Sequence, residues 1–220
     1  ARLEVTLEVG GRRHVAATRL VGRHWALAVA LALATAVALG AEVEGALDAI
    51  GALEPSAERL ELVDAPGGAR LLLDTTKATE ATMAPAFAAL AALPARRRVA
   101  VIGSLWDFVG ATEVEVVDRV ARDALAVADE VILYGPAAQS APAGLVDGRR
   151  VRAALSIHAL SDDLHARFGH GDLVLLKGTF PYDHLVRIAL VGTHDVRCWR
   201  DDCARRTRCG ECRLLGPALK

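Results

Sequence analysis

The sequence predicts an α/β fold in which a Rossmann-like, doubly wound and mostly parallel sheet is preceded by a partial-domain β-hairpin with helices and followed by a four-cysteine tail. Two observations lead to this prediction. From about residue 65 onward, strand-like segments alternate with helix-like segments. Several of those strands, such as VAVIG at 99–103 and DLVLL at 172–176, are apolar at almost every position, which indicates burial on both faces. Parallel strands under helical connections are the arrangement that satisfies both patterns.

The elements of this domain are expected in strict alternation. Strands are expected at residues 70–74, 98–103, 130–135, 151–155 and 172–177. Helices are expected at residues 83–93, 113–128, 139–145, 162–168 and 182–190. A break rich in Pro and Gly near residue 65 marks the start of the domain. We therefore expect three parts: residues 1–64, residues 65–192 and residues 193–220.

The first part begins with a strand pattern. Apolar residues alternate with polar ones from Leu3 to Val9, and Gly10-Gly11 predicts a hairpin turn into a second strand. Helices are expected at 25–40 and 43–53. A two-stranded hairpin is marginal by itself. We therefore expect the hairpin to belong to a sheet whose other strands lie in a longer protein or in a partner subunit.

Composition excludes several classes of protein. The 220 residues can form one large or two small cores, and the formal net charge of −1 gives neither a strongly basic field for nucleic acid nor an acidic balance typical of disorder. The apolar run at 25–40 is mostly alanine and shorter than the ~20 residues of a membrane span. It is predicted to be a buried helix rather than a membrane segment or a signal peptide. A cytoplasmic protein is expected.

Polar residues follow the predicted strands at their carboxyl ends, where open α/β sheets bind ligands. Asp74 and Lys77 follow one strand, and Lys177 ends another. We expect these three side chains to meet at one edge of the sheet. Gly103 and Gly135 also end strands, and the sequence does not decide whether they terminate strands or serve a ligand.

The order of several motifs resembles the Mur ligase family, from late in its central domain to near its end. LLLDTTKATEAT (71–82) is similar to the strand and turn that open the third domain in the D-Ala-D-Ala-adding and glutamate-adding members. GRHWALAVALALATAVALG (22–40) and GALEPSAERLELV (51–63) resemble the helix and connecting stretch before it. RRRVAVIGSLWDFVG (96–110) and DLVLLKGT (172–179) are similar to later family motifs. Together these segments extend over most of the chain up to about residue 192.

The resemblance implies the C-terminal module of an ATP-dependent, ADP-forming amide ligase. In that family a carboxylate is activated as an acyl phosphate with ATP and Mg²⁺, and an amino acid or other amine displaces the phosphate. The resemblance places Asp74, Thr76, Lys77 and Thr79 on the nucleotide side. It places Lys177, Gly178 and Thr179 near the amine substrate, and His184 is a further candidate for that substrate.

Three departures from the family pattern bear on this function. The sequence has no G-x-x-x-x-G-K-[ST] loop, so a partner domain or subunit is expected to supply it. Thr75 and Glu80 stand where the family often has Asp and Asn, and an acid beside a nucleotide needs an offsetting charge. Phe180 replaces an Arg, which predicts a different amine substrate. The alternative is a non-catalytic, Mur-derived binding or scaffold subunit. The carboxylate, the amine and any link to peptidoglycan are not identified by the sequence.

The tail holds all the cysteines of the chain, in the pattern C-x4-C-x5-C-x2-C: Cys198, Cys203, Cys209 and Cys212. The last pair, C-G-E-C, resembles a zinc knuckle, and four thiolates suit tetrahedral Zn²⁺ without leaving an open position for catalysis. A structural zinc ion is the prediction, with an iron–sulfur cluster or reduced or disulfide-bonded cysteines as alternatives. The arginines of the tail are expected to form a solvated basic surface rather than a nucleic-acid site, because aromatic residues among them are few.

Overall fold

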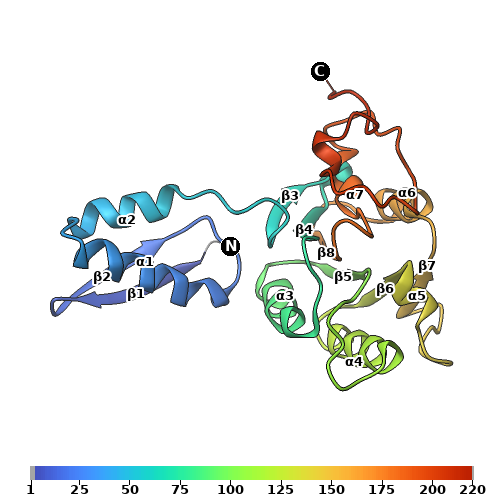
Figure 1. Ribbon diagram of the computed structural model, residues 1–220, viewed down its shortest axis with the longest axis horizontal. Helices are drawn as coiled ribbons and strands as arrows, with labels where there is room; N and C mark the ends of the chain where they lie inside the picture. Colours follow the sequence, from blue (N-terminus) through green and yellow to red (C-terminus); the bar gives the residue numbers. More distant parts are fainter. Residues whose placement is uncertain (1–2, 220) are drawn as a thin grey trace.

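The computed structural model describes residues 3–219 and shows two parts joined by an extended segment. A hairpin with two helices lies to one side, and a layered α/β domain carrying the C-terminal tail lies to the other (Figure 1). The described residues include no helix that is both long enough and apolar enough to cross a membrane.

The N-terminal part is a small helix-on-hairpin layer. Strand β1 (Glu4–Val9) pairs antiparallel with β2 (Arg12–Ala17), and the 3₁₀ turn η1 (Arg23–Trp25) leads into α1 (Ala26–Ala38) and α2 (Val43–Ala52). Both helices pack on one face of the hairpin around the buried side chains of Ala16, Val29, Leu33, Ala46 and Ile50. The predicted hairpin and both predicted helices are present, within a few residues of their expected ends.

The second part is built on a six-stranded sheet. Its strands are β3 (Glu61–Asp64), β4 (Arg70–Asp74), β5 (Arg97–Ile102), β6 (Glu130–Tyr134), β7 (Val151–Ala154) and β8 (Asp172–Lys177). The spatial order is β3-β4-β8-β5-β6-β7, and every pair is parallel except β3 with β4. The last strand, β8, thus lies between β4 and β5. The mostly parallel sheet confirms the predicted fold class.

Helices cover both faces of this sheet. On one face lie α3 (Glu80–Ala92) and α4 (Glu113–Leu125), and on the other lie α6 (Ile157–Arg167) and α7 (Val186–Leu190) together with the tail (Figure 1). The strands alternate their apolar side chains between the two faces, so each face has its own core. Phe87 and Val120 represent the first core, and Leu164 and Ile188 the second. Burial of the strands on both faces explains why their sequences are almost continuously apolar.

The predicted helix at 139–145 is wrong. The helix α5 (Pro136–Gln139) ends at the first residue of that segment, and Pro142 and Gly144, which has a φ of +83°, lie in the loop that follows. Proline and a glycine with left-handed backbone both end helices, so this segment stays irregular. The helix α6 starts earlier than predicted, because the Ser156 side chain accepts a hydrogen bond from the backbone N–H of Ala159 at 3.4 Å.

Two 3₁₀ turns complete the domain. The sheet begins at Glu61, before the expected boundary at residue 65, and a 3₁₀ turn η2 (Pro66–Gly68) joins β3 to β4. The tail adds one further 3₁₀ turn, η3 (Cys209–Glu211), at the end of the described chain. The tail packs against the core beneath α6 and α7, to which Cys209 and Leu215 contribute buried side chains.

Candidate functional site

Asp74 and Lys177 end two strands that pair in register, so their side chains meet at the carboxyl edge of the sheet. Asp74 lies opposite Lys177 in the β4–β8 ladder. The Lys177 ammonium donates to Asp74 Oδ2 at 2.7 Å and to the carbonyl of Lys77 at 2.8 Å, and the residue is 1% exposed. Burial lowers the pKa of Lys177, and the Asp74 carboxylate acts against that shift.

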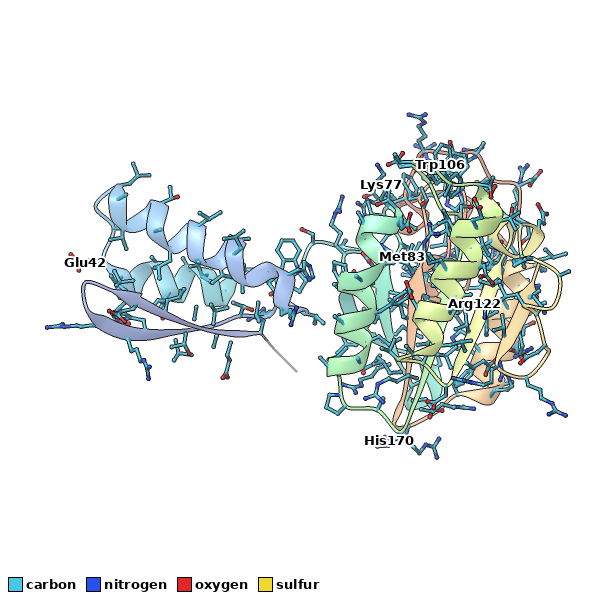
Figure 2. All side chains as sticks on the ribbon, turned by 90° about the horizontal axis from the view of Figure 1, so that it is seen from below. Glu42, Lys77, Met83, Trp106, Arg122 and His170 are labelled. Atoms are coloured by element: carbon cyan, nitrogen blue, oxygen red, sulfur yellow. The ribbon has the colours of Figure 1, made fainter. Side chains whose placement is uncertain are left out.

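The third expected member of the group reaches the same edge by another route. The backbone carbonyl of Lys77 accepts a hydrogen bond from Lys177. The Lys77 ammonium points away from this contact and forms an ion pair with Asp107 Oδ2 at 2.7 Å. Both side chains of this second pair are about half exposed. Figure 2 shows Lys77 at the same end of the domain as Trp106, opposite the end that carries His170. The structure therefore brings Asp74, Lys77 and Lys177 together at one edge.

A cavity of about 310 Å³ opens beside these groups, between the two parts of the chain. It is lined by His24, Trp25, Arg59, Leu60, Asp74, Lys77, Ala81, Thr82, Pro85 and Lys177. Burial lowers the pKa of His24, which favours its uncharged imidazole, and the Asp74 carboxylate acts against that shift. Arg59 is the cavity cation for which no carboxylate of residues 3–219 lies within 4.0 Å. The cavity thus has a net positive lining and one cation available to an anion.

The two threonines predicted for the nucleotide side are engaged in the turn itself. The Thr76 hydroxyl donates to the carbonyl of Glu58 at 3.2 Å. Thr79 precedes α3, where its backbone N–H donates to the Thr82 hydroxyl at 3.0 Å. These contacts fix the path of the chain from β4 into α3 beneath the cavity.

Glu80, a departure from the family pattern, carries its own counter-charge. Its carboxylate accepts from Arg119 Nε at 2.6 Å across the α3–α4 surface. The hydrogen bond to Arg119 lowers the pKa of Glu80. The acid is therefore offset by a cation and faces α4.

A buried carboxylate joins the ends of β5 and β8. Asp183 accepts from the backbone N–H of Ser104 at 2.8 Å, from the Ser104 hydroxyl at 2.5 Å and from the backbone N–H of Thr179 at 2.7 Å. The Thr179 hydroxyl in turn donates to the carbonyl of Ser104 at 2.8 Å and accepts from the N–H of Ala78 at 3.0 Å. Burial raises the pKa of Asp183, and the hydrogen bonds from Ser104 and Thr179 act against it. Thr179 is thus a structural link between three loops.

Gly103 and Gly178 are required because the Asp183 carboxylate approaches their backbones closely. A Cβ added at either position would overlap Asp183 Oδ2.

Replacing Gly178 with alanine is expected to lower the free energy of unfolding by about 1–3 kcal/mol, as overpacking does. Urea denaturation measures the loss. Gly45 is the control: it lies in α2 with no atom near the added Cβ, and G45A is expected to stabilise by about 0.5–1 kcal/mol. A harmless G178A would contradict this role.

His184 does not lie with Lys177. It is buried beside the tail, where Nε2 lies 2.8 Å from the Cys203 carbonyl and Nδ1 lies 3.2 Å from Cys209 Sγ. Its φ of +49° places it in the left-handed region, which turns the side chain into the tail while the neighbouring Asp183 faces the sheet. Burial lowers the pKa of His184.

The four cysteines of the tail line one small cavity together with His184 and Arg187. All four are free thiols, and Cys209 is buried deeply enough that its pKa is raised to about 12. Within residues 3–219, no three His, Cys, Asp or Glu side chains lie close enough together to hold a metal ion. The predicted ligand set is therefore assembled around one cavity but is not drawn into a coordination shell.

A chain of polar contacts connects the tail to the sheet edge. Arg208 Nη1 donates to Glu58 Oε1 at 2.9 Å, and Glu58 Oε2 accepts from the Thr75 hydroxyl at 2.7 Å. The Glu58 carbonyl also accepts from the backbone N–H of Thr75 at 3.1 Å. Thr75 is the residue directly after Asp74, so the tail supports the turn that carries the candidate site.

Sequence reasoning missed three residues of this region. Arg59 lies within the segment GALEPSAERLELV, and that motif was the available signal, although the sequence pattern alone did not single out this residue. His24 stood in a motif as well, yet nothing in the sequence indicated that the N-terminal part would contact the sheet edge. Asp183 carried no signal, because a lone acid in a loop resembles any solvated residue.

Comparison with known proteins assigns the chain to a family. The family model described as Mur ligase, glutamate ligase domain, matches residues 58–180. The chain belongs to the Mur ligase family. Members of this family are ATP-dependent ligases. A search of curated proteins finds no match for this Mur ligase family chain.

Solved structures agree on the fold. The MurF ligase from Thermotoga maritima in complex with ADP has a TM-score of 0.66 at 19% identity, and the match covers 79% of this chain and 39% of that one. MurF from Acinetobacter baumannii has a TM-score of 0.67 at 21% identity, covering 79% and 39%. A pseudomurein peptide ligase type C from Methanothermus fervidus has a TM-score of 0.59 at 14% identity, covering 79% and 36%. This chain thus spans about two fifths of the length of these structures.

Proposed function

We propose that this chain is the C-terminal module of an ATP-dependent, ADP-forming amide ligase that joins an amino acid or other amine to a carboxylate. The observation behind the proposal is the cavity at the carboxyl edge of the sheet, where the buried Asp74–Lys177 pair lies beside Arg59. In this proposal residues 1–64 belong to a central domain, residues 65–192 form the ligase domain and residues 193–220 are an added tail. The ligase would work in the cytoplasm, where ATP is available.

Phosphate groups would be held by the cations of the cavity. Arg59 offers a guanidinium that no carboxylate of the described chain occupies, and guanidinium groups bind phosphate oxygens in a bidentate way. The Lys77 ammonium pairs with Asp107 at an exposed position, where an ion pair is weak and a phosphate can replace the partner. Lys177 fixes the Asp74 carboxylate, whose oxygens are of the kind that Mg²⁺ prefers.

The ATP–Mg²⁺ complex supplies the phosphoryl group that activates the carboxylate substrate. This sequence contains no G-x-x-x-x-G-K-[ST] loop, so the proposal assigns that loop to another domain or subunit. The residues of this chain would bind and orient the nucleotide and exclude water as the two parts close over it.

The amine substrate is assigned to the adjoining side of the edge. Lys177 ends β8, and Gly178 and Thr179 follow it. A second cavity of about 350 Å³, lined in part by Ser104, Trp106 and Tyr182, lies next to this turn, since the Thr179 hydroxyl donates to the Ser104 carbonyl. The indole and phenol rings of Trp106 and Tyr182 stack with their centroids 4.8 Å apart. These rings would contact the body of the amine substrate. His184 has no part in this assignment, because it is buried against the tail.

A matched pair of arginine variants tests nucleotide binding. Arg59→Met is expected to weaken ADP binding about tenfold or more, because a hydrogen-bonded charge contributes roughly 1.5–3 kcal/mol. Arg122→Met is the control, since Arg122 pairs with Asp118 on the surface of α4, and it should leave binding unchanged. Isothermal titration of ADP into the assembly with the loop-bearing part gives both affinities. Equal affinities for the two variants would remove Arg59 from the site.

The alternative function is a non-catalytic binding or scaffold subunit that acts with a loop-bearing partner. One observation favours it: both lysines of the edge are already paired with carboxylates, Asp74 and Asp107. Release of ADP in the reconstituted assembly, dependent on both an amine and a carboxylate substrate, supports the ligase. Nucleotide binding without turnover in that assembly supports the scaffold. The predicted tail zinc takes part in neither function, because four thiolates leave no open position on the ion.

A further inference from the structure

The tail packs a buried guanidinium beside its cysteines, and the charge of that group lacks a partner. Arg187 is 1% exposed. Among residues 3–219 it donates only to backbone carbonyls: Nε to His184 at 3.3 Å, Nη1 to Cys198 at 3.0 Å and Nη2 to Arg200 at 2.7 Å. In the described part of the chain, no carboxylate lies within 4.0 Å of it. Carbonyl dipoles satisfy its hydrogen bonds but do not neutralise its charge, and buried charges are ordinarily paired.

The groups around that charge are sulfur donors. The small cavity beside Arg187 is lined by all four tail cysteines: Cys198, Cys203, Cys209 and Cys212. Neutral thiols leave the guanidinium uncompensated. Thiolates bound to a divalent ion would supply it with negative charge, because four thiolates around one Zn²⁺ carry a net charge of −2.

The size of the cavity limits what it can hold. Its volume is about 10 Å³, which is room for roughly one water-sized sphere. A single ion fits such a space, whereas a multi-atom iron–sulfur cluster needs far more. Three of the cysteines are only partly buried, so their side chains can rotate inward. The turn Cys209–Glu211 is already formed, with the N–H of Cys212 donating to the Cys209 carbonyl at 3.0 Å.

The tail also needs a cross-link of some kind. From Thr193 to Leu219 its regular structure is limited to η3 and a single bridge between His194 and Ala218. Segments with so little secondary structure are commonly held by disulfides or by a structural metal. No disulfide joins the four cysteines in this structure, which favours the metal.

We propose that Cys198, Cys203, Cys209 and Cys212 bind one structural Zn²⁺ ion, and that the buried guanidinium of Arg187 is the counter-charge of this thiolate centre. Binding deprotonates the thiols and releases their protons to the solvent. Arg187 is a positioning residue here: its three hydrogen bonds hold the backbone carbonyls of His184, Cys198 and Arg200, and its charge offsets the thiolates. The proposal does not depend on the ligase function.

Metal analysis of the full chain, purified without chelators, tests the zinc ion. Elemental analysis should find about one zinc per chain, and a thiol reagent should react with the four cysteines only after a chelator removes the metal. Absence of zinc after refolding with excess Zn²⁺ overturns the proposal. So does iron with acid-labile sulfide, or a disulfide found by mass spectrometry in the protein as isolated.

Variants separate the ligands from the counter-charge. Cys212→Ser should abolish stoichiometric zinc. Arg187→Met should weaken zinc about 10- to 100-fold in competition with a chelating dye, as loss of a partner around a metal centre does. Arg205→Met is the matched control, because Arg205 lines the same cavity from an exposed position and should change the affinity by less than about threefold.

Arg187→Lys keeps the proposal testable if the methionine variant does not fold. A lysine retains the charge, so zinc affinity should stay closer to that of the unchanged chain than in any neutral variant that folds, such as Arg187→Gln. Equal zinc affinities for the charged and neutral variants would overturn the role of Arg187. Full zinc retention by Cys212→Ser would overturn the ligand set.

Discussion

Lys177→Met is expected to lower the free energy of unfolding by about 3–5 kcal/mol, because it leaves the Asp74 carboxylate without its partner at a nearly buried position. The pair is formed by two strands far apart in the sequence, so its loss also removes a contact that fixes the register of β4 on β8. Urea denaturation followed by circular dichroism measures the change.

Lys77→Met is the matched control for that variant. Its ammonium pairs with Asp107 where both side chains are about half exposed, so its removal should cost less than about 1 kcal/mol. The double variant Lys177→Met with Asp74→Leu should recover much of the lost stability, since a buried ion pair can be replaced by apolar groups. Similar losses for Lys77→Met and Lys177→Met would contradict the burial argument.

Asp183→Ala is the second substitution with a large expected effect, a loss of about 3–5 kcal/mol. It leaves the backbone N–H groups of Ser104 and Thr179 and the Ser104 hydroxyl without an acceptor in the interior, and each unsatisfied donor costs roughly 1–3 kcal/mol. The ends of β5 and β8 should separate as a result. Amide hydrogen exchange at Ser104 and Thr179 should accelerate more than exchange within β6.

Asp118→Ala provides the comparison for Asp183→Ala. Asp118 pairs with Arg122 on the surface of α4, where solvent screens the ion pair, so the variant should unfold at nearly the same urea concentration as the unchanged chain. If Asp183→Ala unfolds at nearly the same urea concentration as Asp118→Ala, then solvent must reach the donors around Asp183 and the proposed role of that carboxylate is wrong.

The sheet and the polar residues at its carboxyl edge were largely predictable, because they depend on local patterns. Apolar strands that end in Asp74 and Lys177 place both residues at a carboxyl edge whatever the strand order. Their direct contact needed one more fact, the insertion of β8 between β4 and β5. Strand order depends on how the whole chain packs, and the hydrophobic periodicity of single strands does not determine it.

The errors have equally physical causes. The predicted helix at 139–145 followed from the alternation of strands and helices, while Pro142 and a left-handed Gly144 set the backbone. His184 was expected beside a substrate because it follows a strand, but a left-handed backbone turns it into the tail. Arg59 reaches the cavity through tertiary packing alone, which a sequence pattern cannot report.

The link from Arg208 through Glu58 to Thr75 has a practical consequence for anyone who shortens this protein. A version that stops at residue 192 would keep Asp74, Lys77 and Lys177, yet Glu58 would lose its only cationic neighbour within 4.0 Å in the described chain. Ligand affinities measured on such a trimmed protein would reflect a loosened turn. They would underestimate the affinity of the intact protein for the same ligand.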